Sequence, residues 1–239
     1  MSHDTSSNLP HPPRVVTTIN NADDLAFART ADLPSLCDVL EIRLDGLQET
    51  PLELSELQSL HATTPLILTA RREDEGAFSP MSDAARIDAI HQTLLQDAMV
   101  DLEFRTLNST AKSPALTRLL EAMKNNGNTI VMSYHDFNGV PDEAQIRDHL
   151  ACAREHRAIT KIAATVNSTT QLQLWTERLA QLECSNQRFS FMGMGKFGMA
   201  TRLIAASAGS ELNYGFIQSA SVPGQWPAKL LKATIAKLS

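Results

Sequence analysis

Short strand-like runs alternate with helix-length amphipathic segments along nearly the whole chain, and this rhythm constrains the fold more than any other feature. Eight runs rich in apolar residues lie at 15–19, 39–44, 66–71, 100–105, 129–135, 159–164, 189–194 and 214–218. Helix-length segments lie between several of them, at 83–96, 113–125, 142–156 and 168–182, and a last one covers 225–237. Strands that alternate with helices pair in parallel. Eight such units in about 225 residues predict an α/β fold, a single (β/α)₈ TIM barrel.

The length and composition agree with one domain. A chain of 239 residues with 43% hydrophobic residues can build one large core. Residues 1–13 are rich in Pro and Ser and lack alternating apolar residues, so we expect a disordered tail there and the barrel over residues 14–239. No apolar leader or stretch of membrane-spanning length is present.

Charge and cysteine content limit the classes of partner. The 21 basic and 27 acidic side chains give a net charge of −6, which offers no footprint for nucleic acid or an anionic membrane and favours a small-molecule substrate. Cys37, Cys152 and Cys184 are odd in number and widely spaced, so they support neither a disulfide framework nor a metal site. We therefore expect a cytoplasmic protein.

A lysine inside one predicted strand and a histidine at the end of the preceding one draw attention to catalysis. Lys161 lies in an apolar run, where it either snorkels to a strand end or serves as a paired or uncharged buried amine. His135 ends the run before it, one helix-length upstream. Neighbouring parallel strands would bring this amine and this acid/base group to the same edge of the sheet.

Two other predicted strands carry charges on alternate residues. In Glu41-Ile42-Arg43-Leu44-Asp45 the charged side chains share one face, and Asp101-Leu102-Glu103-Phe104-Arg105 repeats the pattern. The charged faces should point into the barrel and pair across Arg71. We interpret Asp45, Asp101 and Glu103 as a structural ion network, and Glu41, Arg43 and Arg71 as substrate contacts.

Three loops at the predicted functional end of the barrel contain further candidates. Glu75 lies in the charged loop after the third strand and could orient a histidine base. The run from Gly193 to Gly198 fits G-x-G-x-x-G but follows a late strand, so we reject a dinucleotide site and expect backbone amides that approach an anion, with Arg202 as a clamp. The loop at 219–225 contains Ser221 and Gln225 and has the composition of a lid or of an ordinary turn.

Together these residues resemble one family, the type I 3-dehydroquinate dehydratases, from residue 15 to residue 238. Any one motif is weak, but their order along the chain is specific. The motifs are Glu41-x-Arg43-x-Asp45, Thr69-x-Arg71, Glu75-Gly76, Ser133-Tyr134-His135-Asp136-Phe137, Lys161-Ile162-Ala163, Met194-Gly195, Arg202-Leu203 and Ser221-x-Pro223-Gly224-Gln225.

The resemblance implies a hydro-lyase of the shikimate pathway that converts 3-dehydroquinate to 3-dehydroshikimate. It implies that Lys161 forms an imine with the substrate ketone, that His135 transfers protons and that Glu75 lies beside this pair. Arg202 matches a carboxylate-binding arginine. The residues matched to those that bind the substrate hydroxyls and close the site are Glu41, Arg43, Arg71, Ser221 and Gln225. The family is commonly dimeric, without metal or organic cofactor.

Some positions depart from the family. The start of the chain lacks the alternation of the β-hairpin that often crosses the barrel floor, so we expect that hairpin to be missing. Thr165, Gly193 and Thr201 replace a methionine and two serines that are common in the family, which affects the expected pocket shape. Two alternatives stay open, another imine-forming barrel such as a class I aldolase and a binding barrel that has lost turnover.

Overall fold

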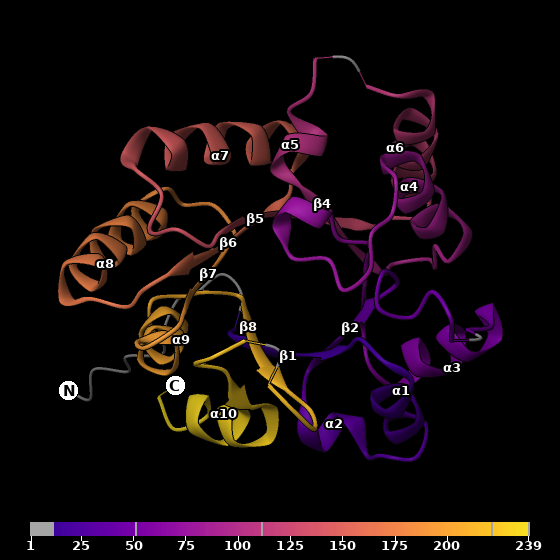
Figure 1. The fold of residues 1–239 in the computed structure, drawn as a ribbon, viewed down its shortest axis with the longest axis horizontal. Helices are drawn as coiled ribbons and strands as arrows, with labels where there is room; N and C mark the ends of the chain where they lie inside the picture. Colours follow the sequence, from indigo (N-terminus) through magenta and orange to yellow (C-terminus); the bar gives the residue numbers. More distant parts are fainter. Residues whose placement is uncertain (1–11, 51, 111, 221, 239) are drawn as a thin grey trace, which may run out of the picture.

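The computed structural model describes residues 12–50, 52–110, 112–220 and 222–238. Nine strands form one sheet in which every pairing is parallel, and the helices lie outside it (Figure 1). The strands are β1 Arg14–Ile19, β2 Val39–Arg43, β3 Leu66–Thr69, β4 Met99–Glu103, β5 Thr129–Asp136, β6 Ile159–Thr165, β7 Phe189–Met194, β8 Leu212–Phe216 and β9 Trp226–Pro227. The predicted α/β barrel class is confirmed.

The sheet order is β7-β6-β5-β4-β3-β2-β1-β8-β9, so the barrel's hydrogen-bond ladder is open between β7 and β8. Other bonds bridge this seam. The Glu211 amide donates to the Phe189 carbonyl oxygen at 2.8 Å, and the Phe191 amide donates to Ser210 Oγ at 3.1 Å. β7 and β8 are therefore joined by individual hydrogen bonds and not by a regular strand ladder.

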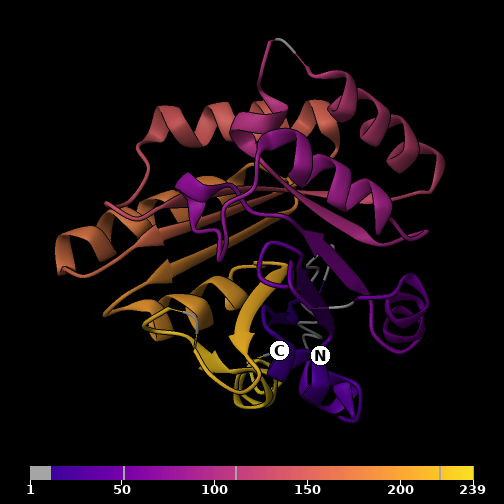
Figure 2. The same cartoon turned by 45° about the vertical axis from the view of Figure 1, so that its right-hand side comes forward.

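Most helices follow the predicted alternation. They are α1 Ala22–Ala28, α2 Leu33–Leu36, α3 Leu54–Thr63, the 3₁₀ turn η1 Glu73–Glu75, α4 Asp83–Gln92, α5 Phe104–Leu107, α6 Pro114–Asn125, α7 Glu143–His156, α8 Thr169–Cys184, α9 Gly198–Ser207 and α10 Ala228–Ile235. Figure 2 shows α4 and α6 side by side over one part of the sheet. Capping side chains start several helices, since Ser113, Asp142 and Ser168 accept hydrogen bonds from amides of the first turn.

Two local expectations are wrong. The fourth predicted strand ends at Glu103, which becomes the N-cap of α5, so Arg105 lies on a helix with its side chain 59% exposed and paired with Asp74 rather than inside the barrel. The helix predicted over 225–237 begins only at Ala228. Pro227 disfavours helical backbone at Trp226, and these two residues instead pair with β8 as β9.

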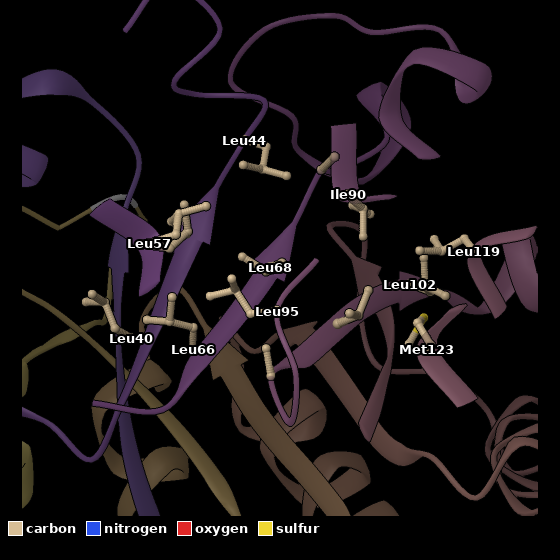
Figure 3. Close-up of a cluster of buried hydrophobic side chains, with 14 of the residues drawn as sticks. Leu40, Leu44, Leu57, Leu66, Leu68, Ile90, Leu95, Leu102, Leu119 and Met123 are labelled. Atoms are coloured by element: carbon tan, nitrogen blue, oxygen red, sulfur yellow. The ribbon is translucent and has the colours of Figure 1, made fainter. Parts of the chain in front are cut away.

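Alternation along the strands produces two apolar layers. Outward-facing Leu40, Ile42, Leu66 and Leu68 pack against helix residues such as Leu57 and form the larger core (Figure 3). Inward-facing residues form a second cluster that fills the lower barrel, and its members include Val16, Val39, Ile67, Met99, Val131, Ile159, Met192, Leu212 and Tyr214. The inner cluster leaves the carboxyl ends of the strands to polar side chains.

The predicted tail, residues 1–13, lies outside the described residues except for Pro12 and Pro13, which have no regular structure. The expectation that no floor hairpin precedes the barrel also falls mainly on that segment and stays a prediction. The described barrel begins with β1 at Arg14, where we expected it.

Candidate active site

One cavity of about 290 Å³ lies at the carboxyl ends of the strands. Eight of the nine residues singled out in the sequence line it together, although they come from three strands and from four other segments of the chain. They are Glu41, Arg43, Arg71, Glu75, His135, Lys161, Arg202 and Gln225. The ninth, Ser221, lies outside the described residues.

Lys161 occupies the middle of β6 and points into the barrel. Its side chain is 4% exposed, and its Nζ lies 2.9 Å from Asp101 Oδ2 and 3.6 Å from Glu41 Oε1. The amine also lies 4.2 Å from the centre of the Tyr214 ring. Lys161 is therefore a buried, paired amine and does not snorkel to a strand end.

Arg71 and Asp101 form a buried pair beside this lysine. The two Arg71 terminal nitrogens each donate to one Asp101 oxygen at 2.8 Å, and Ser133 Oγ donates to Asp101 at 2.6 Å. Burial alone would raise the pKa of Asp101, but the charges of Arg71 and Lys161 hold it well below its usual range. We interpreted Arg71 from the sequence as a substrate contact. It lines the cavity, but its charge is already paired with Asp101.

His135 and Glu75 are in direct contact. His135 Nδ1 lies 3.1 Å from Glu75 Oε2, and the His135 amide donates to the same oxygen at 3.1 Å. Burial raises the pKa of Glu75 to about 7, although Arg71 opposes this rise. Burial, together with Arg71 and Lys161, lowers the pKa of His135 well below 6.5. At neutral pH the ring is therefore an uncharged base beside a carboxyl poised to ionise.

The loop that contains Glu75 is fixed by charged side chains. Arg43 donates to both Asp45 oxygens, at 3.0 and 2.8 Å, and to the Gly76 carbonyl oxygen at 2.9 Å. Asp45 in turn accepts from the amides of Arg71 and Phe78. Gly76 has φ 88°, a left-handed conformation that favours glycine and turns the chain directly after Glu75. Asp45 therefore has the structural contacts that the ion-network interpretation predicts.

Arg202 is a buried cation without an anionic partner among the described residues. It lies in the second turn of α9, is 2% exposed, and its NH1 donates to the Tyr214 carbonyl oxygen at 3.0 Å. Its Nε has no hydrogen-bond partner, and no carboxylate of the described chain pairs with it. Burial lowers the pKa of Arg202 to about 10. Such a group is suited to bind an anion that enters the cavity.

The glycine-rich turn before α9 does not act as we expected. Its amides are already satisfied by protein acceptors, since Gly195 donates to the Pro223 carbonyl at 3.0 Å and Lys196 donates to Asn167 Oδ1 at 2.9 Å. The backbone amides are thus not free for an anion. A side chain at Gly198 would lie 2.8 Å from the Gly224 carbonyl oxygen, so the glycine instead lets this turn approach the 222–225 loop.

Several features of the site were not predicted. Phe78 and Phe137, each 47% exposed, flank the cavity, and Tyr214 lies against Lys161. The sequence does contain a sign of Tyr214, because a polar aromatic residue at an inward position of a barrel strand is unusual. Its contact with Lys161 could not be inferred from the sequence. Of the family departures, Gly193 and Thr201 are in contact, and Thr165 Oγ1 donates to the Asp136 carbonyl at 3.2 Å.

Within the described residues, no group of three or more His, Cys, Asp or Glu side chains could hold a metal ion. No helix in the described segments is long and apolar enough to cross a membrane.

Comparison with known proteins agrees with this geometry. The family model described as Type I 3-dehydroquinase matches residues 15–238. The 3-dehydroquinate dehydratase of Haloarcula marismortui is 28% identical over 226 residues, which cover 93% of this chain and 96% of that protein. The crystal structure of the Aquifex aeolicus 3-dehydroquinate dehydratase has a TM-score of 0.75 at 22% identity and covers 93% of this chain and 97% of that one. The corresponding Geobacillus kaustophilus structure has a TM-score of 0.78 at 20% identity, with 95% and 91% covered.

The two structures show that the fold is shared, and the family model spans the whole described barrel from β1 to α10. It also spans Lys161, the His135–Glu75 pair and Arg202 of the cavity. The chain belongs to the type I 3-dehydroquinase family.

Proposed function

We propose that the protein eliminates water from 3-dehydroquinate to give 3-dehydroshikimate through an imine at Lys161. The single observation that supports this best is the buried Lys161 amine, in one cavity with a neutral histidine base and an arginine that no described carboxylate pairs with. Family membership and the names of the relatives agree with this activity.

In the proposed first step, Lys161 gives one proton to His135 and its amine adds to the C3 ketone of the substrate. His135 then returns this proton to the hydroxyl of the carbinolamine, which leaves as water, so that a protonated imine remains. Asp101 and Glu41, at 2.9 and 3.6 Å from Nζ, hold the amine in place before the reaction and face the positive charge of the imine afterwards. The imine draws electrons from C2, so a modest base can remove a proton there.

His135 is the proposed base and acid. It takes the C2 proton, the electron pair moves to the imine nitrogen, and the enamine then expels the C1 hydroxyl as His135 returns the proton to it. Hydrolysis of the product imine regenerates Lys161. Glu75, bonded to Nδ1 at 3.1 Å, orients the ring and increases its basicity when ionised.

Arg202 is the proposed binding site for the substrate carboxylate, because it is the buried cation whose charge no described carboxylate neutralises. Glu41 and Arg43 are proposed to bind ring hydroxyls, with Arg71, Gln225 and Ser221 completing and closing the site. For Arg71 this contact would be in addition to its pairing with Asp101.

The test of this function combines turnover and trapping. Incubation with 3-dehydroquinate should produce the absorbance of a conjugated enone. Borohydride added during turnover should leave a mass adduct on the peptide that contains Lys161, and Lys161→Ala should abolish both signals. Lys196→Ala is the matched control, since Lys196 is exposed on the neighbouring turn and does not line the cavity. An adduct on Lys196 or Lys229, or no enone, would contradict the proposal.

We also propose that the protein is a homodimer of the cytoplasm. The support is the dimeric habit implied by the family resemblance, together with three free cysteines, of which Cys37 and Cys152 are buried. Light scattering coupled to size-exclusion chromatography should give twice the chain mass of 26.2 kDa. A monomer mass at micromolar concentration would rule out the dimer.

A further inference from the structure

Tyr214 forms part of the cavity floor at the point where two proposed substrate-binding groups meet. It is 5% exposed and faces inward from β8. Its ring lies 4.2 Å from Lys161 Nζ, and its carbonyl oxygen accepts a hydrogen bond from Arg202 at 3.0 Å. Lys161, Arg202 and Tyr214 line the same cavity, so a ligand bound at Lys161 lies beside this ring.

The Tyr214 hydroxyl is buried and has no hydrogen-bond partner among the described residues. Buried polar groups are nearly always paired, because an unmade bond costs desolvation without return. The neighbouring carboxylates are already satisfied. Glu41 accepts from Thr18 and Thr69 at 3.0 Å each, and Asp101 accepts from Arg71 and Lys161. The Tyr214 hydroxyl is thus a hydrogen-bond donor beside the cavity to which no described residue offers an acceptor.

The electrostatic surroundings keep this group a donor. Burial raises the pKa of Tyr214 well above 10, and the charges of Glu41 and Asp101 raise it further, while Arg71 and Arg43 oppose them. The hydroxyl stays protonated throughout the working pH range. It is therefore suited to donate a hydrogen bond to an uncharged oxygen and unsuited to give its proton away.

We propose that the Tyr214 hydroxyl donates a hydrogen bond to the substrate hydroxyl on C4, the carbon next to the one that Lys161 attacks. This inference rests on the proposed function and adds a substrate-binding residue to it. The C3 carbon must bond to Nζ, which the ring touches, so the C3 substituents lie closest to Tyr214. The carboxylate end is taken by Arg202, and the opposite side, toward Glu41, is where the ring hydroxyls would lie.

A purely structural role predicts a different result, and Tyr214→Phe separates the two. The phenylalanine keeps the ring against Lys161 and removes a hydroxyl that makes no bond in the free protein. The melting temperature should stay equal or rise, because an unsatisfied buried group is lost. The kcat/KM for 3-dehydroquinate should nevertheless fall about 3- to 10-fold, as expected for one lost neutral hydrogen bond.

The control is Tyr134→Phe, the other of the two tyrosines in the chain. Tyr134 does not line the cavity, and its ring lies tilted against that of His149 with 4.7 Å between the ring centroids, so the kcat/KM of this variant should stay within about twofold of the parent. A second substrate locates the contact. With the 4-deoxy analogue of 3-dehydroquinate, the parent and Tyr214→Phe should have equal kcat/KM.

Three results would overturn the inference. These are an unchanged kcat/KM in Tyr214→Phe, a loss of kcat/KM accompanied by a lower melting temperature, or a difference between parent and variant that persists with the 4-deoxy analogue. Failure of the proposed function has a different signature, because the parent protein would then produce no enone from 3-dehydroquinate at all.

Discussion

At the level of single residues, two kinds of polar group line the cavity: charges that pair with each other, and buried atoms without a hydrogen-bond partner among the described residues. Arg71 and Asp101 satisfy each other at 2.8 Å, whereas Arg202 Nε, the Tyr214 hydroxyl and Glu75 Oε1 have no partner within the described protein. Leaving buried polar groups unpaired lowers stability by about 1–3 kcal/mol each. These three residues line the same cavity, where a bound substrate could supply the missing partners.

His135→Ala should nearly stop elimination and still permit imine formation, because Lys161 and Arg202 remain. General acid/base catalysis is worth about 10²- to 10⁴-fold for each transfer, and His135 is proposed to act in two, so the loss should reach the upper part of that range. Enone production and borohydride-trapped adduct should be measured on the same samples. Turnover within about tenfold of the parent would exclude His135 as the proton carrier.

The pH dependence should report Glu75. Since its pKa is about 7, kcat/KM should rise with pH through about 7 as Glu75 ionises and increases the basicity of His135. Glu75→Gln should remove this rise and leave a lower, flatter profile. A Glu75→Gln profile that keeps the same inflection near pH 7 would assign it to another group.

The free energy of unfolding should change with pH in the opposite direction to kcat/KM. The raised folded-state pKa of Glu75 means that the folded protein holds a proton which the unfolded chain loses above about 4.5. The stability that this proton provides is complete below pH 4.5 and is lost as pH rises through about 7. The free energy of unfolding of Glu75→Gln relative to the parent, from urea denaturation, should therefore increase between pH 5 and pH 8.

At the scale of elements, α9 is positioned by a close contact with β7. Thr201 Oγ1 accepts from the Gly193 amide at 3.1 Å and donates to the Phe197 and Gly198 carbonyls at 2.9 and 3.0 Å. A side chain at Gly193 would collide with Thr201 Oγ1 and lie 3.1 Å from its Cγ2. Glycine at 193 therefore leaves the space that Thr201 occupies. Because Arg202 is the next residue of α9, the same contact fixes its position.

Gly193→Ser should lower the free energy of unfolding by about 1–3 kcal/mol through overpacking and should weaken substrate binding by displacing Arg202. Adding Thr201→Ala removes the colliding atoms, so the double variant should lose less than the sum of the single ones, with a coupling of at least about 0.5 kcal/mol. Gly139→Ser is the control, because its new Cβ would meet the nearest side chain at 3.8 Å. Additive single effects would disprove the coupling.

At the scale of the whole molecule, the barrel seam is held at its amino-terminal end by one carboxylate. Glu211 accepts from Arg14 at 2.6 Å and from Arg188 at 2.8 Å, which joins the starts of β1, β7 and β8. Its side chain is 3% exposed. The bridge lies at the end of the strands opposite to the cavity, so it contributes to closure of the barrel and not to chemistry.

Glu211→Gln should lower the free energy of unfolding by about 1–3 kcal/mol, because two arginines lose their charged partner. The kcat/KM should remain within about twofold of the parent. Arg147→Gln, which removes an exposed pair with Glu143, should change stability by less than about 0.5 kcal/mol. Equal effects of the two variants in urea denaturation would mean that the seam is not held by Glu211.

The expected tail gives a further test at this scale. We propose that residues 1–12 make no contribution to the barrel, because a Pro- and Ser-rich segment without alternation offers little apolar surface to bury. Deleting them should leave the melting temperature and kcat/KM unchanged. A clear fall in either would mean that the segment packs on the barrel.

The features that could be predicted from the amino-acid sequence are periodic or local. Alternation of strand and helix segments predicts the barrel, and period-two alternation places Glu41, Arg43 and Asp101 on an inward face. Ser113, Asp142 and Ser168 predict helix starts because capping depends on only the next few residues. The family motifs brought the same candidate residues to one expected site.

The pairing of side chains could not be predicted in this way, because it depends on how the strands are arranged in space. Alternation shows which face a residue occupies but not its partner, since partners depend on the curl of the sheet and on which strand ends meet. Asp101 and Lys161, separated by 60 positions, are joined at 2.9 Å, whereas Arg105 leaves the barrel because its strand ends two residues earlier. The glycine-turn amides bond to protein acceptors, whereas the Tyr214 hydroxyl has no partner among the described residues. These outcomes depend on long-range geometry that no local pattern encodes.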